Sequence, residues 1–204
     1  MKIICIGRNY VEHARELNND IPSEPIIFMK PDTALLRNND PFYIPDFSSD
    51  IHYEIELVVK INRVGKSIEK KFAHRYYSEI GLGIDFTARD LQAKLKAKGL
   101  PWEKAKAFDK SAVISGKFIS KDKLEDLDSV KFGLNINGQP VQNGDSSLMI
   151  FSIDTIIEQV SKYFSLKMGD LIYTGTPTGV GAVKIGDHLE GYLEGEKFLD
   201  FMVK

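Results

Sequence analysis

Two glutamates stand inside an otherwise apolar segment, "IHYEIELVV", at residues 51–59. Side chains alternate between the two faces of a strand, so Glu54 and Glu56 project to the same side, together with His52. Isoleucine, leucine and valine occupy both faces nearby, which is typical of an inner strand. A buried carboxylate is costly unless it is paired or binds a metal ion. The fold must therefore bring positive charge to these glutamates or leave that face in water.

A third carboxylate offers a way to complete a cation site. Asp85 ends the next apolar run, "EIGLGID", and it would face the two glutamates if the two strands are neighbours. Oxygen ligands without cysteine favour Mg²⁺, Mn²⁺ or Ca²⁺ over zinc. The alternative is that Glu54 and Glu56 lie on a solvated sheet face and Asp85 caps the following helix. His52 shares the face of the glutamates, although a lone histidine is more often structural or exposed.

The length and charge of the chain limit the classes of protein that it can be. Its 204 residues suit one sizeable domain, or one domain with a small appendage. With 43% hydrophobic and 27% charged residues, it can bury a globular core without disulfides. The net charge of −2, with both signs mixed along the chain, indicates no surface for nucleic acid or for an anionic membrane.

Cysteine content and terminal sequence indicate the compartment. Cys5 is the only cysteine, which excludes an intramolecular disulfide and fits a reducing environment. The apolar run at the N-terminus is too short for a signal peptide, and no stretch approaches the roughly 20 apolar residues of a membrane span. The sequence therefore predicts a cytoplasmic protein.

The N-terminal part of the chain predicts a small unit with one short helix. A strand is expected at about residues 2–6, followed by a helix that ends near the Asn18–Asn19 pair, and then a strand in "IIFMKP". The segment "NDPFYIPDFSSD" holds two prolines and several turn formers. We therefore predict a small N-terminal portion, residues 1–45, and a main domain, residues 46–204.

Strands dominate the main domain, with two helices between them. One helix is expected to open at Thr87, with Asp90 three residues on as in a capping box, and to stop at Gly99. The other is "SIDTIIEQVSKYF", which has isoleucines at helical spacing. No regular β-α-β alternation appears, so we predict an α+β fold that is mostly β. The strands are expected at about residues 52–62, 79–85, 131–136, 170–174, 187–193 and 197–203.

Other polar residues have spacings that are compatible with chemistry. His13 and Glu16 are three apart on the first helix, so the carboxylate can orient the imidazole as a general base; the alternative is two solvent-facing residues. Lys106 stands in the alternation "AKAF", where it points either inward to an anion or to solvent. Gly175 and Thr176 offer an amide and a hydroxyl to a small ligand, or form a turn. Gln92 faces the cleft of Asp85 or water.

Seven segments, taken in their order along the chain, resemble the fumarylacetoacetate hydrolase family. They are "GRNYVEHARE", "FMKP", "HYEIELVV", "GIDFTARDLQ", "GLPWEKAKAFD", "INGQPVQNGDSSLMIFS" and "GDLIYTGTPTGVG". The match is closest to its acylpyruvase and oxaloacetate decarboxylase branch. "SAVISG" departs from the family pattern, in which a proline often follows the alanine. The resemblance implies a mixed β-roll, a homodimer, Mg²⁺ or Mn²⁺ as cofactor, and a small-molecule 2-oxo acid as substrate.

The resemblance also implies roles for individual residues. The metal would be held by Glu54, Glu56 and Asp85. Lys106 would be the active-site lysine, and His13 and Glu16 the catalytic dyad of a lid helix. The residues implied near the substrate are Arg8, Lys30, Gln92, Gly175 and Thr176.

The implied activity is hydrolysis or lysis of a C–C bond in small 2-oxo or 2,4-dioxo acids, such as acylpyruvate hydrolysis or oxaloacetate decarboxylation. Both reactions need metal chelation and stabilisation of an enolate. One alternative is a keto-enol tautomerase of oxaloacetate or a dioxo-acid isomerase, which requires no attack by water. An alternative of another class is a non-catalytic β-module that holds structural Ca²⁺; such a module would be stabilised by Ca²⁺ and not protected by oxalate.

Overall fold

Fifteen strands and five short α-helices make up the described part of the chain. The computed structural model describes residues 1–17 and 19–204, so Asn18, near which we expected the first helix to end, lies outside the described residues. The helices are α1 (Val11–Glu16), α2 (Lys70–Ala73), α3 (Arg89–Ala97), α4 (Glu103–Lys106) and α5 (Ile153–Tyr163). The strands are β1 (Ile3–Gly7), β2 (Ile26–Lys30), β3 (Leu35–Leu36), β4 (Ile51–Tyr53), β5 (Ile55–Ile61), β6 (Tyr77–Asp85), β7 (Thr87–Ala88), β8 (Ala112–Ile114), β9 (Ile119–Ser120), β10 (Lys131–Ile136), β11 (Gln139–Asp145), β12 (Leu171–Tyr173), β13 (Gly181–Ala182), β14 (His188–Leu193) and β15 (Glu196–Met202).

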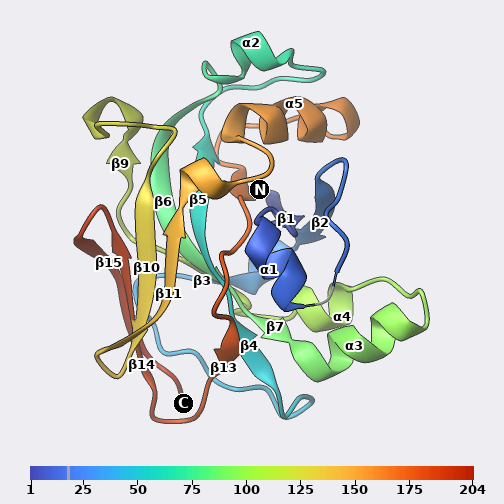
Figure 1. Ribbon diagram of the computed structural model, residues 1–204, viewed down its shortest axis with the longest axis vertical. Coiled ribbons are helices and arrows are strands. Elements are labelled where there is room, and N and C mark those ends of the chain that lie inside the picture. The colour runs from blue at the N-terminus through green and yellow to red at the C-terminus, as the bar shows by residue number, and fades with distance from the viewer. Residues whose placement is uncertain (18) are drawn as a thin grey trace.

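Three sheets organise the strands. The largest runs β2-β1-β12-β5-β6-β8-β3, with β9 paired to β6, and a second sheet runs β11-β10-β14-β15. A small third sheet, β13-β4-β7, continues from β5 and β6. Most pairs are antiparallel, whereas β1 with β12 and β3 with β8 are parallel. Figure 1 shows β10, β11, β14 and β15 on the left side of the molecule. The predicted mostly-β α+β fold is confirmed.

The core lies where the four-stranded sheet packs on the central strands. Leu57, Leu82 and Leu199 are fully buried there. Gly191 on β14 lets the two sheets approach closely, because a Cβ at this position would lie 2.8 Å from the side chain of Leu82. Helix α5 covers the upper end in Figure 1. Its apolar face, expected from the isoleucine spacing, is buried at Ile156 and its neighbours.

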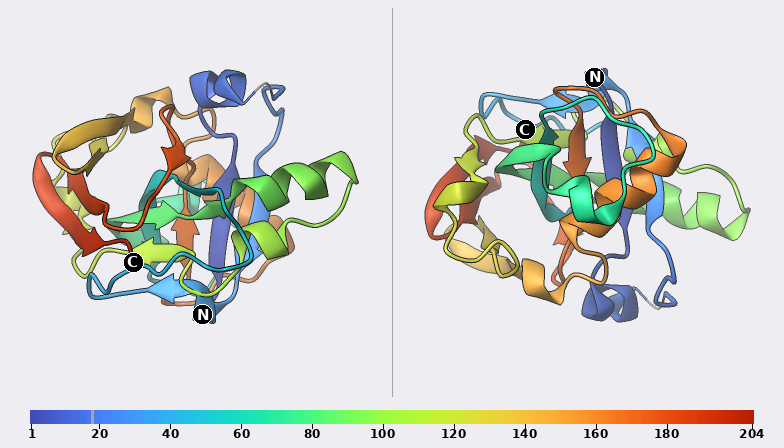
Figure 2. Two further views of the ribbon diagram at one scale, coloured as in Figure 1. Left: turned by 90° about the horizontal axis from the view of Figure 1, so that it is seen from below. Right: turned by 90° about the horizontal axis from the view of Figure 1, so that it is seen from above.

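The helices near the candidate site lie at the edge of these sheets. Figure 2 shows α1 at the periphery, and α3 with the segment leading to α4 projecting away from the strands. Helix α3 ends as expected, since Gly99 adopts a positive φ of 63° just beyond it. Its start differs from the prediction. Thr87 belongs to β7 and is not an N-cap, and Asp90 accepts hydrogen bonds from Ser48 and Leu91.

The predicted strand 52–62 is interrupted at Glu54. The chain passes here from the small sheet to the large one: β4 pairs with β7, and β5 pairs with β6. The neighbouring segment of the chain makes the reverse transition at Phe86, between β6 and β7. The hydrogen-bond ladder between the two segments is thus interrupted at one place in both of them, and Glu54 and Asp85 lie side by side there. The amide of Asp85 donates to the carbonyl of Glu54 at 2.9 Å.

The expected boundary near residue 45 falls in the connection between β3 and β4. On its N-terminal side, β1 and β2 belong to the same large sheet as β5 and β6. Within the described residues, none of the helices has the length and apolar character needed to cross a bilayer.

Candidate active site

Three carboxylates converge at the junction of the large and small sheets. Glu54 precedes β5, Glu56 is its second residue, and Asp85 ends β6. The three residues are 5%, 2% and 1% exposed, and one oxygen atom from each lies within 4.8 Å of the others. The alternative of a solvated sheet face and a helix-capping aspartate is therefore wrong. Such proximity of like charges requires cationic neighbours or a metal ion.

Lys106 supplies the first of these cations. It lies at the end of the one-turn helix α4, and not on the extended segment that its alternation with alanines suggested. Its Nζ donates to Glu54 Oε2 at 2.8 Å, to Asp85 Oδ2 at 2.7 Å and to Thr87 Oγ1 at 2.6 Å. Burial lowers the pKa of Lys106, but the two carboxylates more than offset this and raise it above its ordinary value. Lys106 is therefore charged.

Arg89 supplies a second cation to the same cluster. Its guanidinium donates to Glu54 Oε1 at 2.5 Å and to Gln92 Oε1 at 2.7 Å. Burial would raise the pKa of Glu54, but Lys106 and Arg89 outweigh burial and hold it below the ordinary range. The Thr87 hydroxyl also lies 3.0 Å from Glu54 Oε1. Glu54 is thus ionised and fixed in orientation by three neighbours.

Glu56 has no cationic side chain paired with it within residues 1–17 and 19–204. Its Oε2 accepts a hydrogen bond from the amide of Gly175 at 2.7 Å. Burial, followed by the negative charges of Asp85 and Glu54, raises the pKa of Glu56 well above its ordinary value. A buried carboxylate in this state is stabilised in its ionised form only when further positive charge arrives.

These observations fit a divalent cation. The donor set consists of three carboxylates, which suits Mg²⁺ or Mn²⁺ better than zinc. Glu56 lacks the positive charge that Glu54 and Asp85 receive from Lys106. A cation held among Glu54, Glu56 and Asp85 would supply it.

The raised pKa of Glu56 makes a pH prediction for the metal-free protein. A carboxyl group whose pKa is raised on folding stabilises the native state below its unfolded pKa, and this stability is lost as the pH rises towards the folded value. We expect Glu56→Gln to increase the free energy of unfolding more at about pH 8 than at about pH 5. Urea denaturation in the presence of a chelator measures the difference. A pH-independent difference between variant and wild type would contradict the assignment.

The predicted His13–Glu16 pair forms on α1. His13 Nδ1 lies 3.1 Å from Glu16 Oε2, and the His13 side chain is buried although α1 lies at the edge of the fold. The second oxygen of Glu16 accepts from the amide of Gly179 at 3.0 Å. Glu16 therefore orients the imidazole and also fastens α1 to the loop that follows β12. The alternative of two solvent-facing residues is wrong for His13.

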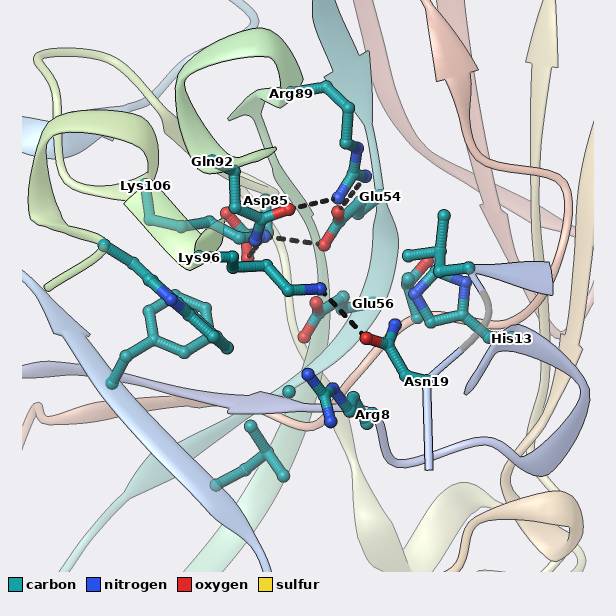
Figure 3. A pocket seen from close by; sticks show the side chains of 16 residues that line it. Arg8, His13, Asn19, Glu54, Glu56, Asp85, Arg89, Gln92, Lys96 and Lys106 are labelled. Atoms are coloured by element: carbon teal, nitrogen blue, oxygen red, sulfur yellow. Dashed lines mark hydrogen bonds and ion pairs between the residues drawn. The ribbon is translucent and has the colours of Figure 1, made fainter. Parts of the chain in front are cut away.

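The pocket at the triad is lined by most of the residues that the sequence singled out (Figure 3). They are Arg8, His13, Glu54, Glu56, Asp85, Gln92, Lys106 and Thr176. The cavity is small, about 40 Å³, which holds no more than a few water molecules. A larger ligand therefore enters only when a segment or side chain of the lining moves.

Three predicted residues do not line the cavity but contact residues that do. Glu16 contacts His13, and Gly175 donates its amide to Glu56. Lys30, with a fully buried side chain, places its Nζ 2.6 Å from Asp85 Oδ1 and 3.0 Å from both the carbonyl and the hydroxyl of Ser111. Lys30 therefore positions Asp85 and does not line the cavity. His52 also lies outside the lining and contacts Asp50 at 2.9 Å.

The loop after β12 is shaped by contacts that fix Gly175 and Thr176. Gly175 has a φ of 100°, and a Cβ there would lie 2.7 Å from the side chain of Asn9. Glycine is therefore required at this position. Gln142 on β11 donates to the Thr176 hydroxyl at 2.9 Å. The Thr176 hydroxyl, which accepts this bond, keeps its own proton for a ligand in the pocket.

Sequence reasoning missed several contributors to the site. Arg89 and Thr87 lie in "FTARDLQ" beside the predicted Gln92, and Arg89 stands three residues before Gln92, a helical spacing that signals contact. Gln142 lies on β11, which contains proline, glycine and asparagine and therefore has no strand signal. β11 is an edge strand, where proline is tolerated.

The sequence is similar to known proteins over most of its length. A family model described as fumarylacetoacetate (FAA) hydrolase, C-terminal, matches residues 2–202. A mitochondrial oxaloacetate decarboxylase of Dictyostelium discoideum is 47% identical over 186 residues, covering 91% of this chain and 85% of that protein. A mitochondrial oxaloacetate tautomerase of Rattus norvegicus is 42% identical over 202 residues, covering 99% and 91%.

A solved structure has the same fold along the whole chain. It is a fumarylpyruvate hydrolase from Pseudomonas aeruginosa in complex with Mn²⁺ and pyruvate. It is 35% identical, with a TM-score of 0.93, and the match covers 100% of this chain and 89% of that one.

Proposed function

The chain belongs to the fumarylacetoacetate hydrolase family of enzymes, and we propose that it cleaves a C–C bond in small 2-oxo or 2,4-dioxo acids with the help of Mg²⁺ or Mn²⁺. The observation that carries this proposal is the buried triad of Glu54, Glu56 and Asp85 in one pocket with Lys106 and His13. The Mn²⁺ and pyruvate in the related fumarylpyruvate hydrolase support this choice of metal and product.

The triad is the proposed metal site. A divalent cation held there would act as a Lewis acid that polarises the 2-oxo acid. Glu54 and Asp85 are already oriented by Lys106, and Glu56 by Gly175, so little rearrangement is needed.

Lys106 and Thr176 bind and stabilise the substrate in this proposal. The charged ammonium of Lys106, held in a buried site, stabilises the enolate that forms as the C–C bond breaks. Fixed charges in a site that excludes water contribute much of the catalysis of such steps. The Thr176 hydroxyl donates to the substrate carboxylate, and Gln142 holds that hydroxyl in place.

The His13–Glu16 pair distinguishes the reactions that this pocket supports. With Nδ1 held by Glu16, His13 uses Nε2 to remove a proton from water, which attacks the distal carbonyl of a 2,4-dioxo acid. The products are pyruvate and a carboxylic acid. Decarboxylation of oxaloacetate requires no attack by water, so it depends on Lys106 and on orientation of the departing carboxylate.

Keto-enol tautomerisation of oxaloacetate is the second candidate, and the tautomerase of Rattus norvegicus supports it. It requires enolate stabilisation and proton transfer without bond cleavage. One assay separates the candidates: acetylpyruvate, fumarylpyruvate and oxaloacetate are supplied with Mg²⁺ while enol absorbance and pyruvate are followed. Loss of enol absorbance without pyruvate identifies a tautomerase, and no turnover of any of the three would refute the proposed function.

Replacing the general base tests the role of the dyad. We expect His13→Ala to lower kcat/KM for acylpyruvate hydrolysis by roughly 100-fold, the lower range for general-base catalysis. Oxaloacetate decarboxylation is expected to change much less, because it needs no activated water. His52→Ala, outside the pocket lining, is the control. Equal losses of hydrolysis and decarboxylation in His13→Ala would argue against water activation.

We also propose that the protein is a homodimer, that it is cytoplasmic, and that it divides into residues 1–45 and 46–204. Sedimentation equilibrium tests the first of these directly.

A further inference from the structure

The pocket has a second pair of cations, Arg8 and Lys96, which are more exposed to solvent than the triad and lie at the mouth of the pocket. Arg8 follows β1, and Lys96 lies in the last turn of α3; both line the pocket. Lys96 Nζ reaches across to Asn19 Oδ1 at 2.9 Å, as the dashed line between them in Figure 3 shows. Arg8 and Lys96 therefore approach the cavity from opposite elements.

These two cations are not neutralised as the deeper ones are. Lys106 and Arg89 both pair with Glu54, at 2.8 Å and 2.5 Å. Within the described ranges 1–17 and 19–204, Arg8 and Lys96 form no ion pair with a carboxylate. Lys96 is exposed, and its partner is the neutral amide of Asn19, so none of the described carboxylates balances its charge.

The backbone conformation of Arg8 and the positive charges around Lys96 both raise the free energy of the pocket when no ligand is bound. Arg8 has a φ of 58°, in the left-handed region that long side chains rarely adopt. Burial, followed by the positive charges of Arg8 and Arg89, lowers the pKa of Lys96 below its ordinary value. Mutually repelling cations held at a pocket mouth are stabilised by an anion that binds between them.

The net charge of the whole pocket lining also favours the binding of an anion. Four cationic side chains (Arg8, Arg89, Lys96 and Lys106) face the three carboxylates, so the lining has a formal excess of one positive charge. A divalent cation would raise this excess to three. A substrate with one carboxylate compensates a single charge, whereas a substrate with two compensates both the deep site and the mouth.

We propose that Arg8 and Lys96 form a recognition site for a second, distal carboxylate, so that these two side chains determine how strongly the pocket prefers 2-oxo acids with two carboxylates over those with one. The inference rests on the proposed function, because it takes the 2-oxo acid end of the substrate to lie at the triad. Lys96 exchanges its bond to Asn19 for a charge-assisted bond to the distal carboxylate. Arg8 approaches the same group from β1.

A matched pair of unreactive ligands isolates the distal carboxylate. Oxamate and N-oxalylglycine share the same oxo-carboxylate end, and only N-oxalylglycine has a second carboxylate. Calorimetric titration into the Mg²⁺-loaded protein gives the ratio of their Kd values. We expect wild type to bind N-oxalylglycine more tightly than oxamate, and Lys96→Met to reduce this preference about tenfold.

The control is Lys94→Met, an exposed lysine on the same helix that does not line the pocket. It is expected to keep the wild-type preference within about twofold. No preference in wild type, an unchanged preference in Lys96→Met, or equal weakening of both ligands would each overturn the inference. Turnover is not needed for this measurement. Failure of the substrate assay therefore refutes the proposed function separately, while the binding ratio still decides the role of Lys96.

Discussion

Glu54→Gln is expected to lower kcat/KM by roughly 10³-fold for every substrate that the wild type accepts. Glutamine keeps the shape of the side chain but removes the charge that faces Lys106 and Arg89. It also weakens one of three proposed metal ligands. Hydrolysis, decarboxylation and tautomerisation all need the metal and the enolate charge stabilised, so all three reactions should fall together.

Kinetics at increasing Mg²⁺ and a calorimetric titration of Mn²⁺ measure this effect. Glu79→Gln on β6 is the matched control, since Glu79 forms a half-exposed pair with Lys60 away from the pocket. Full activity of Glu54→Gln at saturating Mg²⁺ would exclude the metal-dependent mechanism. Loss of only one of the three reactions would exclude a shared enolate step.

Lys106→Met is expected to impair both catalysis and stability. Removing the ammonium leaves the buried carboxylates of Glu54 and Asp85 without their common partner. Removing one side of a buried ion pair costs about 3–5 kcal/mol of unfolding free energy. We expect a loss of this size in the metal-free protein, and a fall in kcat/KM of roughly 10³-fold.

Metal binding should reverse part of the stability loss. A divalent cation supplies positive charge to the same carboxylates, so Mg²⁺ or Mn²⁺ should stabilise Lys106→Met more than it stabilises the wild type. Urea denaturation with and without metal measures both effects. Lys104→Met, an exposed neighbour on α4, is the control. If Lys106→Met unfolded like Lys104→Met, the ion-pair network would not have the importance assigned to it.

The carboxylates could be predicted from the sequence because their signal is local. Two glutamates in an apolar segment are costly to bury, so the sequence alone required either positive charge or water on their face of the strand. Which residues supply the positive charge could not be predicted. Lys106 comes from a one-turn helix, and Lys30 and Arg89 from other segments. Only the tertiary structure brings these side chains together.

Secondary structure, too, could be predicted only where its signal is local. Long strands with apolar alternation, such as β6 and β10, were predicted closely, whereas β3, β7 and β13 have two residues each and no periodicity. The interruption at Glu54 also left no mark in the sequence, since the apolar residues continue through it. Its cause is the divergence of two sheets, which depends on pairing between distant segments.

The two contacts of Glu16 link the chemistry of the pocket to the position of α1. One oxygen orients His13, and the other accepts from the amide of Gly179 on the loop after β12. If α1 moved away from that loop, the contact with Gly179 would break, and His13 and Glu16, which both lie on α1, would leave the triad together. Activation of water would then depend on the position of α1 against the pocket. One carboxylate therefore couples the placement of a helix to the step that only hydrolysis requires.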